Sequence, residues 1–330
     1  MSKTGWIVLI VCLCLVFCIC AGIFLAGRVA SRIFTDWGSS RVDTSTTKDY
    51  KDLKNEFSEK GIYYVEKMED LKELTVDWIS GSVTIELSDG DKVCIQETAD
   101  ASIREKDALR YGVSGNKLRI QACKKNYVGK LPRKDLLIVL PRSLAAGLKE
   151  LEIDTVSASV SAYELHLDEL EIDSVSGKVD FQDVVAEEAR FDTVSGDVTL
   201  RDCSVDSLHM NSVSARLSVT GDAKKVKTSS VSGAVELTLD SCKEVRVNTM
   251  SGSVTLDFAQ APKSLQVDTT SGKTDLTLPK DASCTIDLDA MSGKLYLNDE
   301  AVSSKKITLG DGDASYDIDA MSGSVYVHTK

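Results

Sequence analysis

The residues that could carry acid–base or nucleophilic chemistry are few in this chain. Its only histidines are His166, His209 and His328. A nucleophile needs a base within hydrogen-bonding reach, and a metal ion needs clustered ligands. The histidines fall at different phases of a sequence repeat or near the C-terminus, so the sequence brings no such group together. We therefore predict no catalytic residue, no cofactor and no metal site.

A carboxylate position that recurs once per repeat is the best candidate for metal chemistry. Its members, each three residues before a serine, are Asp154, Asp173, Asp192, Asn211, Ser229, Asn248, Asp268, Asp289 and Asp319. Such oxygens could bind calcium, or they could cap turns by accepting bonds from backbone N–H groups. We favour capping, because the neutral Asn and Ser members relieve like-charge repulsion and the glycine-rich nonapeptide of calcium β-rolls is missing.

A basic segment, residues 121–142, is the first candidate binding surface. Its charged residues are Lys124, Lys125, Lys130, Arg133, Lys134 and Arg142 against Asp135, a local charge of 6 − 1 = +5 in a chain of net charge −12. It could contact anionic lipid headgroups or wall polymers, or it could be a solvated loop. Tyr296 and Tyr326, each four residues after a repeat serine, are further candidate contacts or a cross-strand aromatic pair.

The repeat that positions these residues is centred on Ser-Gly or Ser-Ala. Its serines are Ser80, Ser114, Ser157, Ser176, Ser195, Ser214, Ser232, Ser251, Ser271, Ser292 and Ser322. From Ser157 the copies are 18 to 21 residues apart, and the last interval is 30. A period near 20 with strand patterning is typical of a solenoid.

Each Ser-Gly marks a corner between two strands. Apolar residues alternate before it, as at Leu170 and Ile172, and after it, as at Val179 and Phe181, but with an odd offset. That offset requires a bend, since a one-residue slip turns every side chain to the other face. The corner residues are Ser176, Gly177, Ser195, Gly196, Gly233, Gly252, Gly272, Gly293 and Gly323. Alanine at the equivalent positions 158 and 215 indicates that small size matters more than positive φ.

The sequence therefore predicts an all-β fold. Residues 62–330 form a parallel β-solenoid with coils of about 19–20 residues, which bury their apolar faces only when neighbouring coils stack about 4.8 Å apart.

The first residues have a different character. Residues 6–26 run 21 positions without a charge, long enough to cross a bilayer. We predict a short tail over 1–5, a transmembrane helix over 6–27, a polar linker over 28–61 and the solenoid domain over 62–330. The basic residues after the span, Arg28, Arg32 and Arg41, favour a cytoplasmic domain. The simplest use of one N-terminal span is nevertheless to tether a domain outside the cell, and we predict that location.

Composition excludes some functions. The net charge of −12 and pI near 4.9 argue against a nucleic-acid partner, and an aromatic content of 6% argues against an aromatic-lined carbohydrate binder.

The repeats of the DSVSGKV type, with LKELTVDWISGSVTIEL before them and GDGDASYDIDAMSGSVYV at the end, resemble a bacterial family of β-strand-repeat proteins. That family is catalogued as "putative adhesins" of unknown function, often membrane-anchored. The resemblance implies a β-solenoid at the cell envelope, linked in some members to envelope stress, and it supplies no catalytic residues. We predict a non-catalytic adhesion, sensing or scaffolding surface whose partners are the membrane and envelope polymers, anionic lipid or other envelope proteins. The alternatives are a polysaccharide-acting β-helix enzyme and a passive spacer.

Overall fold

The computed structural model describes residues 53, 56–66, 68–124 and 131–330. The predicted tail 1–5, the predicted transmembrane helix 6–27 and the predicted linker up to residue 52 lie outside the described residues. Within those described ranges, no helix combines the length and the apolar character that a membrane span requires. The described chain forms two compact units, an N-terminal unit that ends at Phe191 and a C-terminal unit over Asp192–Lys330.

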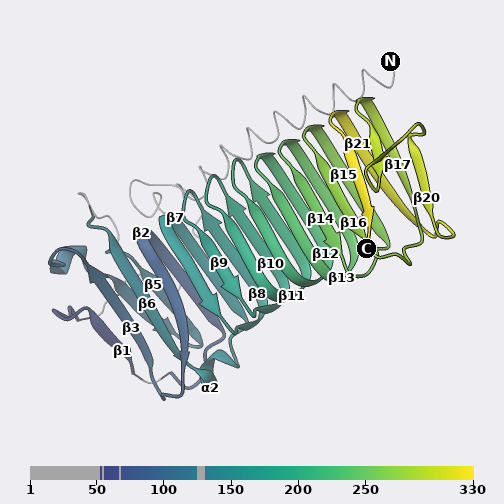
Figure 1. Cartoon of the computed structure of the whole chain (residues 1–330). Coiled ribbons are helices and arrows are strands. Elements are labelled where there is room, and N and C mark those ends of the chain that lie inside the picture. Colours follow the sequence, from purple (N-terminus) through teal and green to yellow (C-terminus); the bar gives the residue numbers. More distant parts are fainter. Residues whose placement is uncertain (1–52, 54–55, 67, 125–130) are drawn as a thin grey trace, which may run out of the picture. The chain divides into compact units, whose positions relative to one another are not determined.

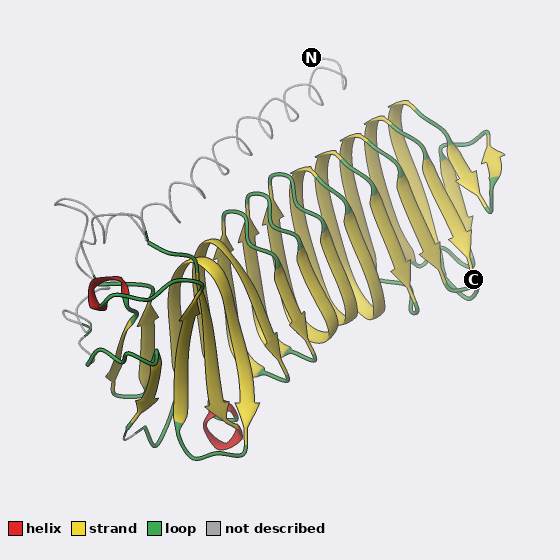
Figure 2. Cartoon of the chain, turned by 60° about the vertical axis from the view of Figure 1, so that its left-hand side comes forward, coloured by secondary structure: helices red, strands yellow, loops and turns green. Residues whose placement is uncertain are grey.

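Strands make up both units, and the predicted all-β class is confirmed (Figure 2). The described helical structure is one 3₁₀ turn, η1 (Glu105–Asp107), and one α-helical turn, α2 (Arg142–Ala145).

Parallel coils form the body of the N-terminal unit. Strand β2 (Glu73–Ser88) pairs in parallel with β7 (Glu150–Tyr163), and this register places Ser80 opposite Ser157. Strand β7 pairs in parallel with β8 (His166–Ser174) and β9 (Val179–Gln182), and β8 pairs with β10 (Val185–Thr193). The predicted stacking of one repeat on the next is confirmed here.

On the edge of β2 that does not pair with β7, the coils do not follow one another in the order of the sequence. Strands β5 (Lys117–Gln121) and β6 (Lys134–Pro141) pair there in parallel with β2. Antiparallel strands complete this edge: β4 (Arg110–Ser114) pairs with β5, β3 (Val93–Ala99) with β6, and β1 (Ile62–Val65) with β3. The assignment of Ser114 to the repeat is wrong. It faces Lys117 across a hairpin whose turn holds Gly115 at φ 62°.

The C-terminal unit begins with coils in sequence order. The strands are β11 (Val198–Ser212), β12 (Leu217–Ser232), β13 (Val235–Ser251), β14 (Val254–Phe258), β15 (Ser264–Ser271) and β16 (Thr274–Leu278). All pair in parallel from one coil to the next.

The last two coils exchange places. Strands β21 (Ala314–Ser322) and β22 (Val325–Thr329) insert between the β15–β16 coil and the coil of β17 (Cys284–Ser292) and β18 (Leu295–Leu297), as Figure 1 shows for β15, β21 and β17. The long interval between Ser292 and Ser322 holds β19 (Glu300–Val302) and β20 (Lys306–Leu309), which pair antiparallel with β18 and β17. Stacking in strict chain order, which the repeat implies, is therefore wrong at this place.

The core lies inside the coils, where the alternation predicts it. Leu170, Ile172, Val179 and Phe181 are all nearly inaccessible to solvent. Buried residues alternate in the strand before the corner and, in a different phase, in the strand after it. The chain must therefore bend between the two strands, as predicted.

Two hydroxyl contacts fix the corners. The hydroxyl of Ser174 accepts a hydrogen bond from the N–H of Gly177 (3.0 Å), and Thr193 accepts one from Gly196 (3.1 Å). The residues that cap these amides are therefore Ser174 and Thr193. Each directly follows the aspartate that the sequence predicts as the cap. The corner serine links neighbouring coils, since the hydroxyl of Ser176 donates to the carbonyl oxygen of Val156 (3.3 Å).

The corner glycines lie against the backbone of the next coil. A Cβ atom added to Gly177 would lie 1.7 Å from the carbonyl oxygen of Ala158, and one added to Gly252 would lie 2.0 Å from that of Gly233. Neither glycine has a positive φ. Close approach of two coils therefore explains these two glycines.

Candidate binding surfaces

The predicted basic surface is divided between interior and exterior. Lys125 and Lys130 lie outside the described residues. Lys124 and Arg133 are exposed, whereas Lys134 is only 2% exposed. Including Lys134 in an exposed surface is therefore wrong.

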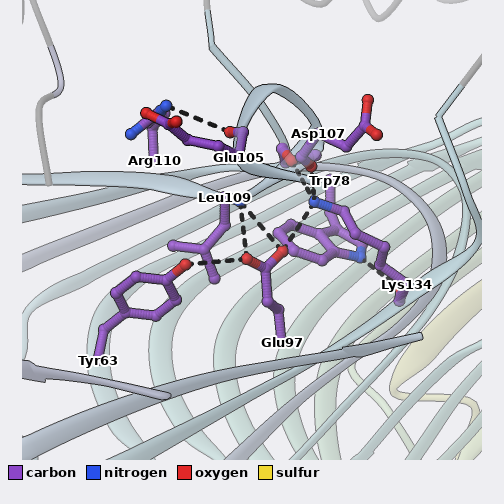
Figure 3. Close-up of polar contacts among 9 residues, drawn as sticks. Tyr63, Trp78, Glu97, Glu105, Asp107, Leu109, Arg110 and Lys134 are labelled. Atoms are coloured by element: carbon purple, nitrogen blue, oxygen red, sulfur yellow. Dashed lines mark hydrogen bonds and ion pairs between the residues drawn. The ribbon is translucent and has the colours of Figure 1, made fainter. Parts of the chain in front are cut away.

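The Lys134 ammonium group occupies a polar cluster inside the N-terminal unit (Figure 3). It donates to Glu97 Oε2 (2.9 Å) and to the carbonyl oxygens of Asp107 (2.7 Å) and Ala122 (2.5 Å). It also lies 5.0 Å from the centroid of the Trp78 ring. Burial lowers the pKa of Lys134, and the Glu97 carboxylate opposes that shift. All three N–H donors of the ammonium group are thus engaged.

Glu97 collects the other contacts of this cluster. Its carboxylate accepts hydrogen bonds from the Tyr63 hydroxyl (3.1 Å) and the Leu109 N–H (3.0 Å). The Trp78 indole N–H donates to the Lys134 carbonyl oxygen (2.9 Å). Burial, helped by the Glu97 charge, raises the pKa of Tyr63 to about 12. The cluster joins β1, β2, β3 and β6, so its role is to hold the antiparallel edge on the coils.

A sequence signal for the burial of Lys134 exists but was missed. Lys134 is in the same strand phase as Leu136, Ile138 and Leu140, and all four side chains are buried. In a strand, residues two apart share one face. The strand phase therefore predicts that Lys134 is buried, although the number of basic residues nearby favours an exposed surface.

The two candidate tyrosines form a stacked pair. The ring centroids of Tyr296 and Tyr326 are 4.6 Å apart, with an interplanar angle of 4°. The ammonium of Lys273 lies 4.3 Å from the centroid of the Tyr326 ring. Because β22 lies between β16 and β18, these neighbours cover both faces of that ring. Tyr326 can offer a partner its edge and hydroxyl, but no stacking face.

An exposed group of basic residues in the C-terminal unit escaped the sequence analysis. We call it the cationic face. Its members are Lys224, Lys225, Lys227, Lys243, Arg246 and Lys263, and all six are exposed. They are spread over 40 residues of sequence (224–263) and are brought together by the coil register of β12, β13 and the segment that leads into β15.

The register places cations beside one another on neighbouring coils. His209 pairs with Lys227, and Lys227 pairs with Arg246. Near the other side of the face, the N–H of Lys263 donates to the carbonyl oxygen of Lys243 (2.9 Å). Neighbouring strands are about 4.8 Å apart, so the cationic face contains two rows of closely spaced basic residues.

Carboxylates also face one another in this unit. Asp268 lies opposite Asp319 on β15 and β21. Burial raises the pKa of Asp268 to about 6, and the charge of Asp319 and a hydrogen bond to it contribute to the shift. Burial, then the charge of Asp289, raises the pKa of Asp319. The Asp268 carboxyl therefore holds its proton to higher pH than an isolated aspartate does.

Sequence comparison identifies the family. The model of the family described as Toastrack DUF4097 matches residues 71–328. The chain belongs to the Toastrack family. This match confirms the predicted resemblance to β-strand-repeat proteins of unknown function. No curated protein matches the chain.

The solved structures that are similar to this chain include three bacterial proteins. A "putative lipid binding protein" from Parabacteroides distasonis has 16% identity and a TM-score of 0.49, covering 81% of this chain and 95% of its own. A "putative adhesin" from Bacteroides fragilis has 12% identity and a TM-score of 0.39, covering 82% and 97%. A "putative cell adhesion protein" from Clostridium sporogenes has 11% identity and a TM-score of 0.21, covering 82% and 98%.

The chemistry-bearing residues of this Toastrack chain are dispersed. His166 begins β8, His209 lies in β11 and His328 lies in β22. His209 Nε2 is 3.2 Å from the hydroxyl of Ser207 on the same strand. Among the described residues, no group of three or more His, Cys, Asp or Glu side chains is arranged to hold a metal ion.

Proposed function

We propose that this Toastrack chain is a membrane-anchored envelope protein whose coils act as a non-catalytic surface for adhesion, sensing or scaffolding. The observation that carries the proposal is the constant register of outward-facing side chains. His209, Lys227 and Arg246 occupy one row across three coils, while the inward residues between them are buried. A repeated row offers equivalent contacts to an extended partner.

The arrangement of charge supports a binding surface. The buried ionic groups Lys134 and Glu97 bond to each other, which is a structural use of charge. The exposed cations instead stand in rows at strand spacing, accessible from solvent. Repeat proteins use extended surfaces built from successive repeats for recognition.

The apolar sequence 6–26 supports the anchor, and a labelling experiment tests the location. Native Cys284 is buried and is unsuitable as a reporter. Ser264 is exposed, so Ser264→Cys should react with a membrane-impermeant maleimide in intact cells. The unsubstituted chain controls for the native thiols. Labelling that requires lysis would place the domain inside and overturn the envelope role.

Turnover assays test the alternative of a polysaccharide-acting enzyme. The full chain incubated with isolated envelope glycans should release no fragments. Fragment release that disappears in His209→Ala would replace the proposal with catalysis, because His209 is the histidine in contact with a hydroxyl group.

A further inference from the structure

We propose that the cationic face of the C-terminal unit binds a linear polyanion that runs along the rows of basic residues from coil to coil. This inference deepens the proposed function by naming the chemical class of the partner. It is carried by geometry: six exposed cations lie on three neighbouring coils.

Most of these cations form no ion pair with any residue that the structure describes. In the part of the chain that the structure describes, Lys224 is the member of the face that forms an ion pair, with Asp206 (2.6 Å). The carboxylates around the others are Glu244, in register with Lys225, and Asp268, which acts electrostatically on Arg246. Cations therefore outnumber carboxylates on the face, although the whole chain is acidic.

Like charges in register are unfavourable unless something neutralises them. Lys227 lies opposite Arg246, and like charges directly opposite on paired strands destabilise a sheet. In the row of Lys227 and Arg246 the N-terminal unit also has like charges, Glu152 opposite Glu171, but in the row of Lys224 and Lys243 it has opposite charges. There Lys149 and Asp168 occupy successive coils and form an ion pair of 2.7 Å. The cationic face keeps its repulsion, and an external anion would relieve it.

The spacing of the rows favours a chain of anions over a single one. Successive coils present a cation about every 4.8 Å, so a polymer with closely spaced charged groups can neutralise several coils at once. Linked contacts of this kind raise affinity far above that of one group. Repeating phosphate and repeating carboxylate share this chemistry. The acidic body outside the face repels a partner of the same sign, which confines binding to these rows.

Fluorescence anisotropy tests the proposal with the full chain, kept in solution by a non-ionic amphipol. The probes are labelled long-chain polyphosphate and labelled poly-glutamate at about 0.1 M salt, where charges act over about 10 Å. The face variant combines Lys225→Gln, Lys227→Gln, Lys243→Gln and Lys263→Gln. The control variant combines Lys60→Gln, Lys106→Gln, Lys280→Gln and Lys294→Gln, which are exposed lysines outside the face.

We expect the wild type and the control variant to bind polyphosphate alike, and the face variant to bind roughly 600-fold more weakly, since each of the four cations contributes about a factor of five. Binding should weaken as salt rises, with a smaller slope in the face variant. Orthophosphate at equal phosphate concentration should not compete. Binding of poly-glutamate as well would show that charge spacing suffices, whereas binding of polyphosphate alone would specify phosphate; both support the proposal.

Three results would overturn it: no wild-type binding to either polymer at low salt, equal losses in the face and control variants, or tighter binding of the same face to phosphatidylglycerol vesicles than to either polymer. Salt-sensitive self-association without polymer binding, seen by sedimentation velocity, would also count against it and assign the face to a second copy. These outcomes are independent of the cell-labelling result. Thiol labelling could therefore support envelope display while polymer binding fails, or the reverse.

Discussion

Lysine is used in opposite ways in the two units. Lys134 of the N-terminal unit is 2% exposed, and its ammonium has three hydrogen-bond acceptors. Lys227 of the C-terminal unit is exposed and lies in register with Arg246. A buried charge must be satisfied by the protein itself, whereas an exposed one is satisfied by water or by a partner. Strand phase separates the two cases, because it decides which side of the coil each lysine faces.

The largest effect should follow from breaking the buried pair. Lys134→Met leaves the Glu97 carboxylate buried without its cation, together with two carbonyl oxygens that lose their donor. Removing one partner of a buried ion pair costs about 3–5 kcal/mol. Urea unfolding should therefore show a fall of that size in the free energy of unfolding.

The neighbouring Arg133→Met is the matched control. Arg133 is exposed, and surface substitutions usually change stability by less than about 0.5 kcal/mol. Equal, small effects of the two substitutions would show that the Lys134 cluster contributes no more to stability than a surface charge.

The next largest effect on stability should come from adding a side chain at a crowded corner glycine. Alanine at the equivalent positions 158 and 215 indicates that the corners tolerate alanine, but a Cβ on Gly177 would lie 1.7 Å from the Ala158 carbonyl oxygen. Gly177→Ala must push two coils apart, and overpacking of this kind costs about 1–3 kcal/mol. Gly90→Ala is the control, because the one atom near its added Cβ is the Ser88 hydroxyl at 3.4 Å. A Gly177→Ala midpoint in urea equal to that of Gly90→Ala would contradict the crowded corner.

The aspartate pair should give a pH-dependent effect. The pKa of Asp268 is raised from 3.8 to about 6 by burial and by Asp319, so the folded state holds this proton more tightly than the unfolded chain. Its contribution to stability is full below about pH 4 and is lost as pH rises through 6. The amide group in Asp268→Asn can donate a hydrogen bond to Asp319 without first binding a proton from solvent. The variant should therefore be more stable than the wild type at pH 7.

Unfolding midpoints measured from pH 4 to 8 check this prediction. The difference between Asp268→Asn and the wild type should grow across the window from 4 to 6. Exposed Asp281→Asn should track the wild type throughout. A difference that stays constant with pH would mean that Asp268 does not titrate in that window.

The repeat was readable because it is a local pattern. The alternation at Leu170, Ile172, Val179 and Phe181 is written in successive residues, and it determines which side chains are buried. The motif at Ser114 misled because a Ser-Gly pair also suits a hairpin turn, where Gly115 takes φ 62°. Short motifs alone could not distinguish a corner from a hairpin.

Long-range order was beyond the local pattern. Insertion of β21 between β15 and β17 leaves the alternation of each strand unchanged, and only the long interval after Ser292 hinted at it. The cationic face was hidden for a related reason. Its members are interleaved with Asp240 and Glu244. The sequence therefore shows only the short basic run at residues 224–227, and the register adds Lys243, Arg246 and Lys263 to it.

The smallest effect on stability should come from substituting Lys227, the exposed lysine of the comparison. Lys227→Gln removes one of two like charges held in register with Arg246, and like-charged pairs on neighbouring strands are destabilising by about 0.2–1 kcal/mol. The variant should therefore unfold at a slightly higher urea concentration than the wild type at low salt. The gain should vanish at 1 M salt, where the screening length falls to about 3 Å. Lys149→Gln, which removes the ion pair with Asp168, should shift the midpoint in the opposite direction at low salt. A loss of stability in Lys227→Gln at low salt would mean that this lysine is satisfied within the protein, and the distinction between a buried structural lysine and an exposed lysine available to a partner would no longer hold.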